Sequence, residues 1–165
     1  MSHLQAATQN RRASTIMLAL TSLGLLAINT VLQVRTMIAI KQPSVVDDNT
    51  NRAFYVLLAA AIIGLLGIIF ITALLYFSSM NMGLNTICAL FLLINGGLST
   101  HASIKLQCNA SNLEKALSYT HWTALLGLFG GFFVLLVTGY LATDKSSRQK
   151  VIEGLTGYQP VSKQT

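Results

Sequence analysis

Long apolar runs separated by short polar segments dominate this chain. The longest, FYVLLAAAIIGLLGIIFITALLYF at residues 54–77, has no charge and no proline, and Thr72 is its one polar residue besides Tyr55 and Tyr76. As a helix it covers about 36 Å, whereas a bilayer core of about 30 Å needs about 20 apolar residues. The tyrosines stand near its ends, where aromatic rings prefer the headgroup level. The run predicts a transmembrane helix, and three similar runs argue against the alternative of a buried helix in a soluble domain.

The same reasoning predicts an all-α polytopic membrane protein with four transmembrane helices in an antiparallel bundle. The expected spans are residues 15–38, 54–77, 84–102 and 121–142, with polar tails at 1–14 and 143–165 and polar loops at 41–53 and 103–120. The link SSMNMG is so short that spans two and three must form a hairpin. In the second loop, Ser111 and Glu114 fit a capping box, which predicts a short helix from Ser111 to Tyr119.

The first run has a second interpretation as a cleaved signal peptide, because Arg11 and Arg12 precede it as a basic region precedes the apolar core of such a peptide. The run is longer than a usual signal-peptide core, and it has no clear small-x-small cleavage site before polar sequence. We therefore expect a retained span with Arg35 near its far interface, where the long side chain reaches toward water.

Composition agrees with a membrane protein of one domain. Hydrophobic residues make up 53% and charged residues 10% of the 165 residues, against about 25% charged residues in soluble domains. A net charge of +6 raises the question of nucleic acid, but no basic run interleaved with aromatic residues occurs. The basic residues lie instead near the ends of the apolar runs, as membrane topology requires. We expect membrane lipids as partners and no nucleic acid.

Four spans place both termini on one side of the membrane. With cytosolic termini the inner segments hold six basic residues and the outer segments five, so the positive-inside rule alone decides little. Asn109 is the glycosylation candidate, because Asn109-Ala110-Ser111 is the one N-x-S/T sequon in the chain. A glycan there would place the second large loop in the lumen or outside the cell. This reasoning favours cytosolic termini.

Small residues four positions apart occur in two spans. Gly127 and Gly131 form a GxxxG in the fourth span, and Ala60 and Gly64 repeat the spacing in the second. Such residues lie on one helix face and allow two helix backbones to approach closely. They are candidates for helix packing, either within the bundle, which we favour, or as a surface for self-association.

The interior polar candidates are Asn29 and Asn95. An amide inside a membrane needs a hydrogen-bond partner, so both side chains are expected to face other helices. A substrate path is the alternative, and it predicts a water-accessible cavity lined by these residues and Asn85. Carriers coupled to ions or protons usually hold an ionisable group at mid-depth. The spans have none at their centres, which favours structural amides.

The sequence gives no clear sign of catalysis, a metal or a cofactor. His101, Cys108 and His121 are spread too widely for a recognised metal-binding spacing, and no nucleophile elbow occurs. The histidines are interpreted as interfacial residues. Cys108 is either a protected thiol or a site of pairing with another chain, and Cys88 is interpreted as a small apolar filler. We expect a protein that is not an enzyme.

The C-terminal tail carries a sorting-signal candidate. Tyr158 and Val161 fit the pattern Y-x-x-Φ, and Gly157 precedes them as in the signals of lysosomal membrane proteins. Peptides of this type bind adaptors as an added strand that presents alternate side chains. A chance match in a free tail is the alternative. The functional interpretation implies cytosolic termini and a clathrin-type adaptor as a partner.

The layout of four spans, two modest outer loops and a tight middle turn resembles the MARVEL-type membrane proteins. Fungal members related to non-classical export proteins are the most similar, through His101-Ala102-Ser103 and Cys108-Asn109 after the third span. His121-Trp122 stands where such proteins often carry a basic residue and a cysteine. The resemblance implies a role in membrane microdomains or vesicle traffic without catalysis.

These observations together predict a multi-pass membrane protein that acts by lateral helix association, with itself or with another membrane protein. Its expected place is an endosome, lysosome, vesicle or the plasma membrane, and its expected role is membrane organisation or traffic. A small transporter or channel subunit is the alternative from another class. An accessory subunit of a larger membrane complex is the third.

Overall fold

The computed structural model describes residues 3–41, 47–77, 82–107 and 114–142, and within these ranges it contains four α-helices and no strand. The helices are α1 (His3–Lys41), α2 (Asp48–Phe77), α3 (Met82–Gln107) and α4 (Glu114–Ala142). Each is long and apolar enough to cross a bilayer. The prediction of an all-helical, four-span membrane protein is therefore confirmed.

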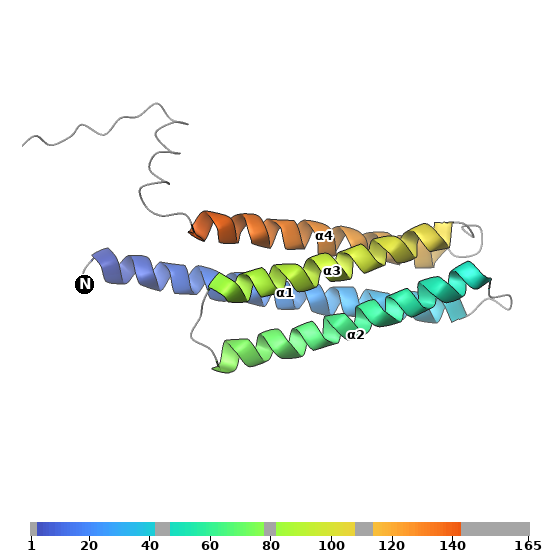
Figure 1. The fold of residues 1–165 in the computed structure, drawn as a ribbon, viewed down its shortest axis with the longest axis horizontal. Helices are drawn as coiled ribbons and strands as arrows, with labels where there is room; N and C mark the ends of the chain where they lie inside the picture. The colour runs from blue at the N-terminus through green and yellow to red at the C-terminus, as the bar shows by residue number, and fades with distance from the viewer. Residues whose placement is uncertain (1–2, 42–46, 78–81, 108–113, 143–165) are drawn as a thin grey trace, which may run out of the picture.

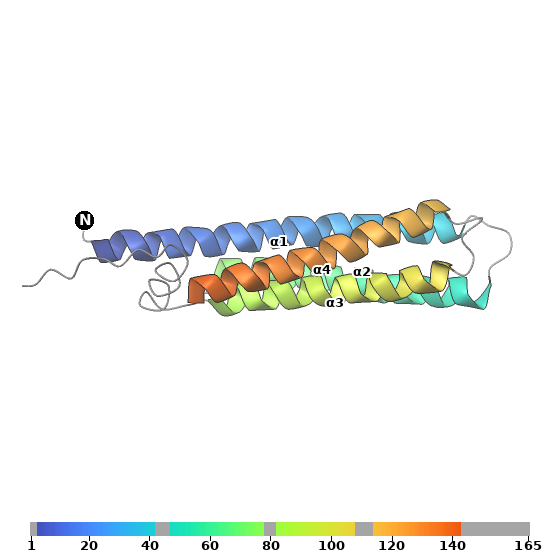
Figure 2. The same cartoon turned by 90° about the horizontal axis from the view of Figure 1, so that it is seen from above.

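The four helices form an elongated bundle in which successive helices run in opposite directions (Figures 1 and 2). α1 and α3 are parallel and contact each other through the middle of the bundle. α2 and α4 lie on opposite sides of this pair and do not touch along their described lengths. Side chains that α1 and α3 direct toward each other are thus the most enclosed in the molecule.

The helices extend beyond the apolar runs from which they were predicted. α1 begins at His3, within the segment expected to be a tail, and its first turns extend past the other helices (Figure 2). α2 already begins at Asp48, where the Asp48 carboxylate lies 2.9 Å from the Arg52 guanidinium. The short helix expected at 111–119 was wrong as a separate element, because α4 continues without a break from Glu114 to Ala142. These helices can continue into water because polar residues are compatible with a helix, whereas glycine and proline are strongly unfavourable there.

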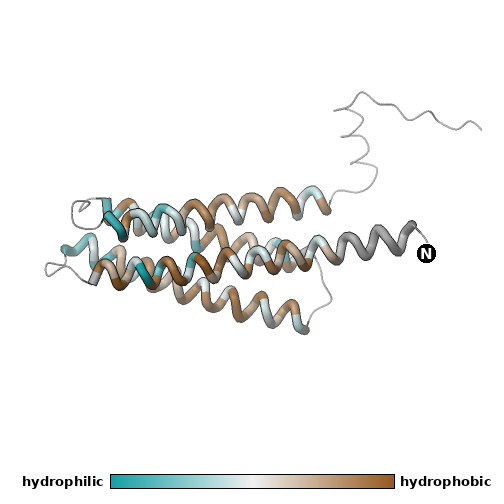
Figure 3. Tube along the Cα trace, turned by 180° about the vertical axis from the view of Figure 1, so that it is seen from behind, coloured by the Kyte–Doolittle hydropathy of each residue, from teal (hydrophilic) through white to brown (hydrophobic). Residues whose placement is uncertain are grey.

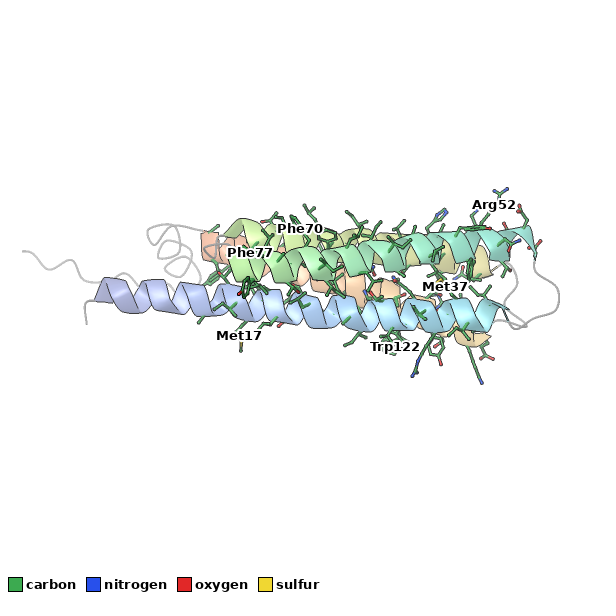
Figure 4. The ribbon with its side chains drawn as sticks, turned by 90° about the horizontal axis from the view of Figure 1, so that it is seen from below. Met17, Met37, Arg52, Phe70, Phe77 and Trp122 are labelled. Carbon is green, nitrogen blue, oxygen red and sulfur yellow. The ribbon has the colours of Figure 1, made fainter. Side chains whose placement is uncertain are left out.

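Aromatic side chains mark two levels along the bundle. Tyr55 and Trp122 are exposed near the starts of α2 and α4, and Tyr76 and Tyr140 are exposed near their ends. The two tyrosines of α2 are about 32 Å apart along the helix at about 1.5 Å per residue, which matches a bilayer core of about 30 Å. Trp122 lies on the outside of the bundle (Figure 4). These levels place the middle of the membrane near Leu66 of α2.

Small residues form much of the core, and large apolar side chains form the surface. The buried positions of α2 recur every three or four residues: Thr50, Ala53, Leu57, Ala60, Ala61, Gly64, Gly67 and Ile71. Met17, Ile69, Phe129 and Leu136 are all at least 66% exposed. Exposing this apolar surface to water would be unfavourable, whereas exposing it to lipid is not. Because lipid provides no hydrophobic driving force for helix association, the small core residues contribute by allowing the helices to pack closely. Polar segments gather at the end where α1 meets α2 and α3 meets α4 (Figure 3).

Candidate functional site

A cluster of buried amides connects three helices near mid-depth. The Asn95 side chain of α3 accepts hydrogen bonds at Oδ1 from Asn29 Nδ2 (3.3 Å) and Gln33 Nε2 (2.8 Å), both on α1. Its Nδ2 donates to the Ala60 carbonyl of α2 at 2.9 Å. Gln33 Nε2 also donates to Ser99 Oγ at 3.0 Å. Asn95 is therefore the shared partner of the cluster, and its side chain fixes α1 and α2 relative to α3.

Gly64 provides the space for this cluster on the α2 side. A Cβ at Gly64 would lie 2.5 Å from Thr30 Oγ1 and 3.1 Å from Asn95 Nδ2. One turn further along, a Cβ at Gly67 would lie 2.8 Å from the Phe91 ring. Gly64 thus allows polar groups from α1 and α3 to lie against the α2 backbone, and Gly67 makes room for apolar side chains, as expected for small residues at membrane helix interfaces.

The backbones of α3 and α4 contact each other at Gly96 and Gly127. A Cβ at Gly127 would lie 2.5 Å from Gly96 Cα, and a Cβ at Gly96 would lie 2.6 Å from the backbone nitrogen of Leu128. Gly131 faces α3 one turn along, where its Cβ would meet the Leu93 side chain at 2.6 Å. The GxxxG of α4 is buried inside the bundle and does not form an outward surface for self-association.

Two adjacent residues of α3, Asn95 and Gly96, together contact the three other helices. Asn95 bonds α1 and α2, and the adjacent Gly96 contacts the backbone of α4. Adjacent positions on a helix point about 100° apart, so they reach partners on different sides. One dipeptide of α3 therefore contacts all three other helices.

Most buried hydroxyls behave differently from the amides. Ser22, Thr30, Thr36 and Thr138 each donate to the carbonyl four residues earlier in their own helix, at 2.6–2.8 Å. Such bonds satisfy the hydroxyl locally and require no partner on another helix. The specific contacts between helices come mainly from the amides and the glycines.

Some buried polar atoms have no hydrogen-bond partner among the described residues. They are Asn29 Oδ1, Gln33 Oε1, both amide atoms of Asn85, and Ser103 Oγ. Leaving a buried polar atom unpaired costs about 1–3 kcal/mol. All five atoms belong to α1 and α3, so the unpaired polarity is concentrated on the central pair of helices.

The structure brings the predicted interior residues together and adds one that sequence reasoning missed. Asn29 and Asn95 face each other, Ala60 supplies the carbonyl bonded by Asn95, and Gly64 packs beside both. Gln33 was overlooked because it stands two residues from Arg35, where the span was expected to approach water. Its position four residues after Asn29 places both amides on one helix face and was the available signal.

The remaining candidates lie apart from this cluster. His101 and His121 are exposed, and Cys88 is buried. The described residues contain no group of three or more histidine, cysteine or acidic side chains able to hold a metal ion. Asn109, Cys108 and the sorting candidate Gly157, Tyr158 and Val161 lie outside the described residues.

Comparisons with protein-family models, with curated proteins and with solved structures found no match for this chain.

Proposed function

We propose that this protein acts without catalysis, by lateral association in the membrane, as a component that organises membrane or accompanies vesicles. The observation that carries the proposal is the closed interior. Asn29 and Asn95 are 0% exposed and Asn85 is 1% exposed, so none of the three amides lines a channel that is open to either surface of the membrane. The contacts left for a partner are on the outside, where the surface is broad and apolar.

The helix best suited to such association is α4. It is the least buried helix, with 22% of its most apolar stretch buried against 33–44% in the others. Phe129, Phe132 and Phe133 are each exposed by 58% or more on its outer side. Aromatic side chains bury large areas and are enriched at the centres of protein interfaces. We take a second copy of the chain as the first partner to test, and another membrane protein as the next.

Replacing Phe132 and Phe133 together with alanine is expected to reduce self-association at least several-fold, because two large contact side chains are removed from the proposed interface. Resonance energy transfer between labelled copies in vesicles measures the associated fraction. The matched control is Ile62→Ala with Ile69→Ala, which removes exposed apolar side chains from α2. Equal energy transfer in the original protein and both variants would contradict the proposal. So would the absence of energy transfer in the original protein, if no partner co-purifies with it in mild detergent.

A small transporter or channel subunit remains the alternative proposal, and it rests on the unpaired amides between α1 and α3. It requires a second conformation in which these helices separate and water reaches Asn29, Asn85 and Asn95. An accessory subunit of a larger complex would instead use the same outer surface as self-association. The MARVEL-like layout supports the first proposal, since that resemblance implies microdomain or vesicle traffic roles.

Tyr158→Ala is expected to move the protein from endosomal membranes to the cell surface, because the change removes the aromatic side chain that an adaptor pocket would bind. Fluorescence microscopy of a tagged protein measures the distribution. Gln159→Ala is the matched control, since it keeps the tyrosine and the apolar residue. An unchanged endosomal distribution of Tyr158→Ala would refute the sorting signal.

Asn109→Gln is expected to remove a glycan, and with it a shift in gel mobility, if the second large loop faces the lumen as proposed. Treatment with a glycosidase should produce the same shift in the original protein. Ser111→Ala, which destroys the sequon but keeps Asn109, should match Asn109→Gln. A glycan that persists in both variants would show modification at another site and contradict the proposed topology.

A further inference from the structure

A line of polar side chains runs along the contact between α1 and α3. Four of the six buried polar positions described on α1 recur at intervals of seven residues: Thr15, Ser22, Asn29 and Thr36. On α3 the buried polar positions are Asn85, Asn95, Ser99 and Ser103. A spacing of seven keeps residues on the same side of a packed helix. Because these helices are the central pair of the bundle, the line lies away from lipid.

Two leucines interrupt this line at mid-depth. Leu26 of α1 and Leu92 of α3 are both 0% exposed and belong to one apolar cluster. Leu26 lies against Gly67 of α2, and Leu92 lies near Gly130 of α4. The aromatic levels place these positions close to the middle of the membrane. Leu26 stands between Ser22 and Asn29 along α1, and Leu92 between Asn85 and Asn95 along α3, so the two leucines divide the polar line into two parts.

Unpaired polar atoms occur on both sides of the leucines. Asn85 lies toward the end of the bundle where α3 starts, and neither its oxygen nor its nitrogen has a partner among the described residues. Asn29 Oδ1 and Gln33 Oε1 lie on the other side, with Ser103 Oγ further along. The amide nitrogens of Asn29 and Gln33 are used by Asn95, so their oxygens still require hydrogen-bond donors.

We propose that the α1–α3 contact holds two internal water sites, one at Asn85 and one at Asn29 and Gln33, separated by the Leu26–Leu92 closure. Water fits the chemistry on both sides. It donates two hydrogens, as two carbonyl oxygens require, and at Asn85 it both donates and accepts. Among the described residues no buried side chain carries a charge, which favours a neutral ligand over an ion.

The leucine closure determines whether the two water sites connect with each other. The side chains enclose the unpaired atoms, so a water enters only when the Gln33 or Asn85 side chain changes its rotamer, and the water then bonds the atoms that lack a partner. An apolar constriction resists wetting and stops a continuous file of water. The two sites therefore hydrate separately, each from its own side of the membrane, and the bundle remains closed to flow.

The first test uses the unchanged protein in lipid bilayers. Solid-state NMR with magnetisation transfer from water should show early transfer to the side-chain amides of Asn85, Asn29 and Gln33. The methyl groups of Leu26, Leu92 and Val134 should receive it several-fold more slowly, because no polar atom holds water beside them. Absence of early transfer at either amide site would overturn the proposal of two sites.

The second test concerns the closure. Leu26→Ser and Leu92→Ser should each raise the osmotic water permeability of reconstituted vesicles about threefold or more, because a hydroxyl wets the constriction. Leu90→Ser is the matched control, since Leu90 is 50% exposed on the lipid side of α3. The fluorescence of Trp122, the one tryptophan, verifies that each variant is folded. Folded variants at both leucines with the permeability of the original protein would overturn the closure, and the NMR result stands if a variant does not fold.

Discussion

Replacing Gly96 with alanine is expected to destabilise the bundle by about 2–3 kcal/mol or more, whereas the same change at the adjacent Gly97 is expected to stabilise it slightly. The new Cβ at Gly96 would lie 2.6 Å from the Leu128 nitrogen and 2.8 Å from the Gly127 carbonyl carbon. These are backbone atoms, so α3 and α4 must separate, and overpacking of this kind costs about 1–3 kcal/mol or more. A Cβ at Gly97 would meet nothing within 4 Å.

Gly96→Ala and Gly97→Ala are expected to change the free energy of unfolding in opposite directions, so each variant serves as the control for the other. In an exposed helical position alanine gains about 0.4–1 kcal/mol over glycine by reducing the freedom of the unfolded chain. Reversible unfolding in mixed detergent micelles, followed by the fluorescence of Trp122 on α4, measures both free energies. Two variants with equal free energies of unfolding, or a Gly97→Ala variant less stable than Gly96→Ala, would contradict the glycine contact between α3 and α4.

Replacing Asn95 with leucine is expected to reduce the free energy of unfolding by about 2–4 kcal/mol. The change removes the acceptor shared by Asn29 and Gln33 and the donor to the Ala60 carbonyl. Hydrogen bonds between membrane helices contribute about 0.6 kcal/mol on average and up to about 1.7. Each buried group left unpaired adds about 1–3 kcal/mol. Leucine has the same branched skeleton as asparagine but larger terminal groups, so overpacking at this buried position adds to the cost.

The double variant Asn29→Leu with Asn95→Leu separates pairing from simple loss of polarity. Removing both partners leaves fewer unpaired groups, so the double change should cost less than the sum of the two single changes by about 0.5–3 kcal/mol. Asn51→Leu is the control at an exposed position, with an expected effect within about 0.5 kcal/mol. Strict additivity of the two interior changes would show that Asn29 and Asn95 do not interact.

Hydropathy predicted the four helices, because a bilayer allows few structures for an apolar run that is long enough to cross it. The helix ends were less predictable. α1 starts at His3 and α3 continues to Gln107, beyond the apolar runs, because the backbone stays helical wherever no residue stops it. Hydropathy identifies the part of a helix that lies in lipid and gives no information on the part that lies in water.

The contacts between helices were predictable by residue type but not by partner. The small-residue spacing identified Gly64 and Gly127 as packing positions, but pairing Gly127 with Gly96 depends on the rotation of two helices and the offset between them. Gln33 lies two residues before Arg35, which suggests a position near the interface, and only its spacing of four residues from Asn29 indicates that it shares the amide face. Rotations and offsets arise from all contacts together, so they require the structure.

All four helices meet at Asn95 and Gly96, and α1 and α3 contact each other through amides near mid-depth. The most direct test is a through-space ¹⁵N–¹³C correlation spectrum of the protein in lipid bilayers, with asparagine and glutamine labelled. We expect correlations from the Asn29 and Gln33 side-chain nitrogens to the Asn95 side-chain carbon, since those nitrogens lie 3.3 Å and 2.8 Å from Asn95 Oδ1. A spectrum in which Asn95 correlates with neither residue of α1 would contradict this contact.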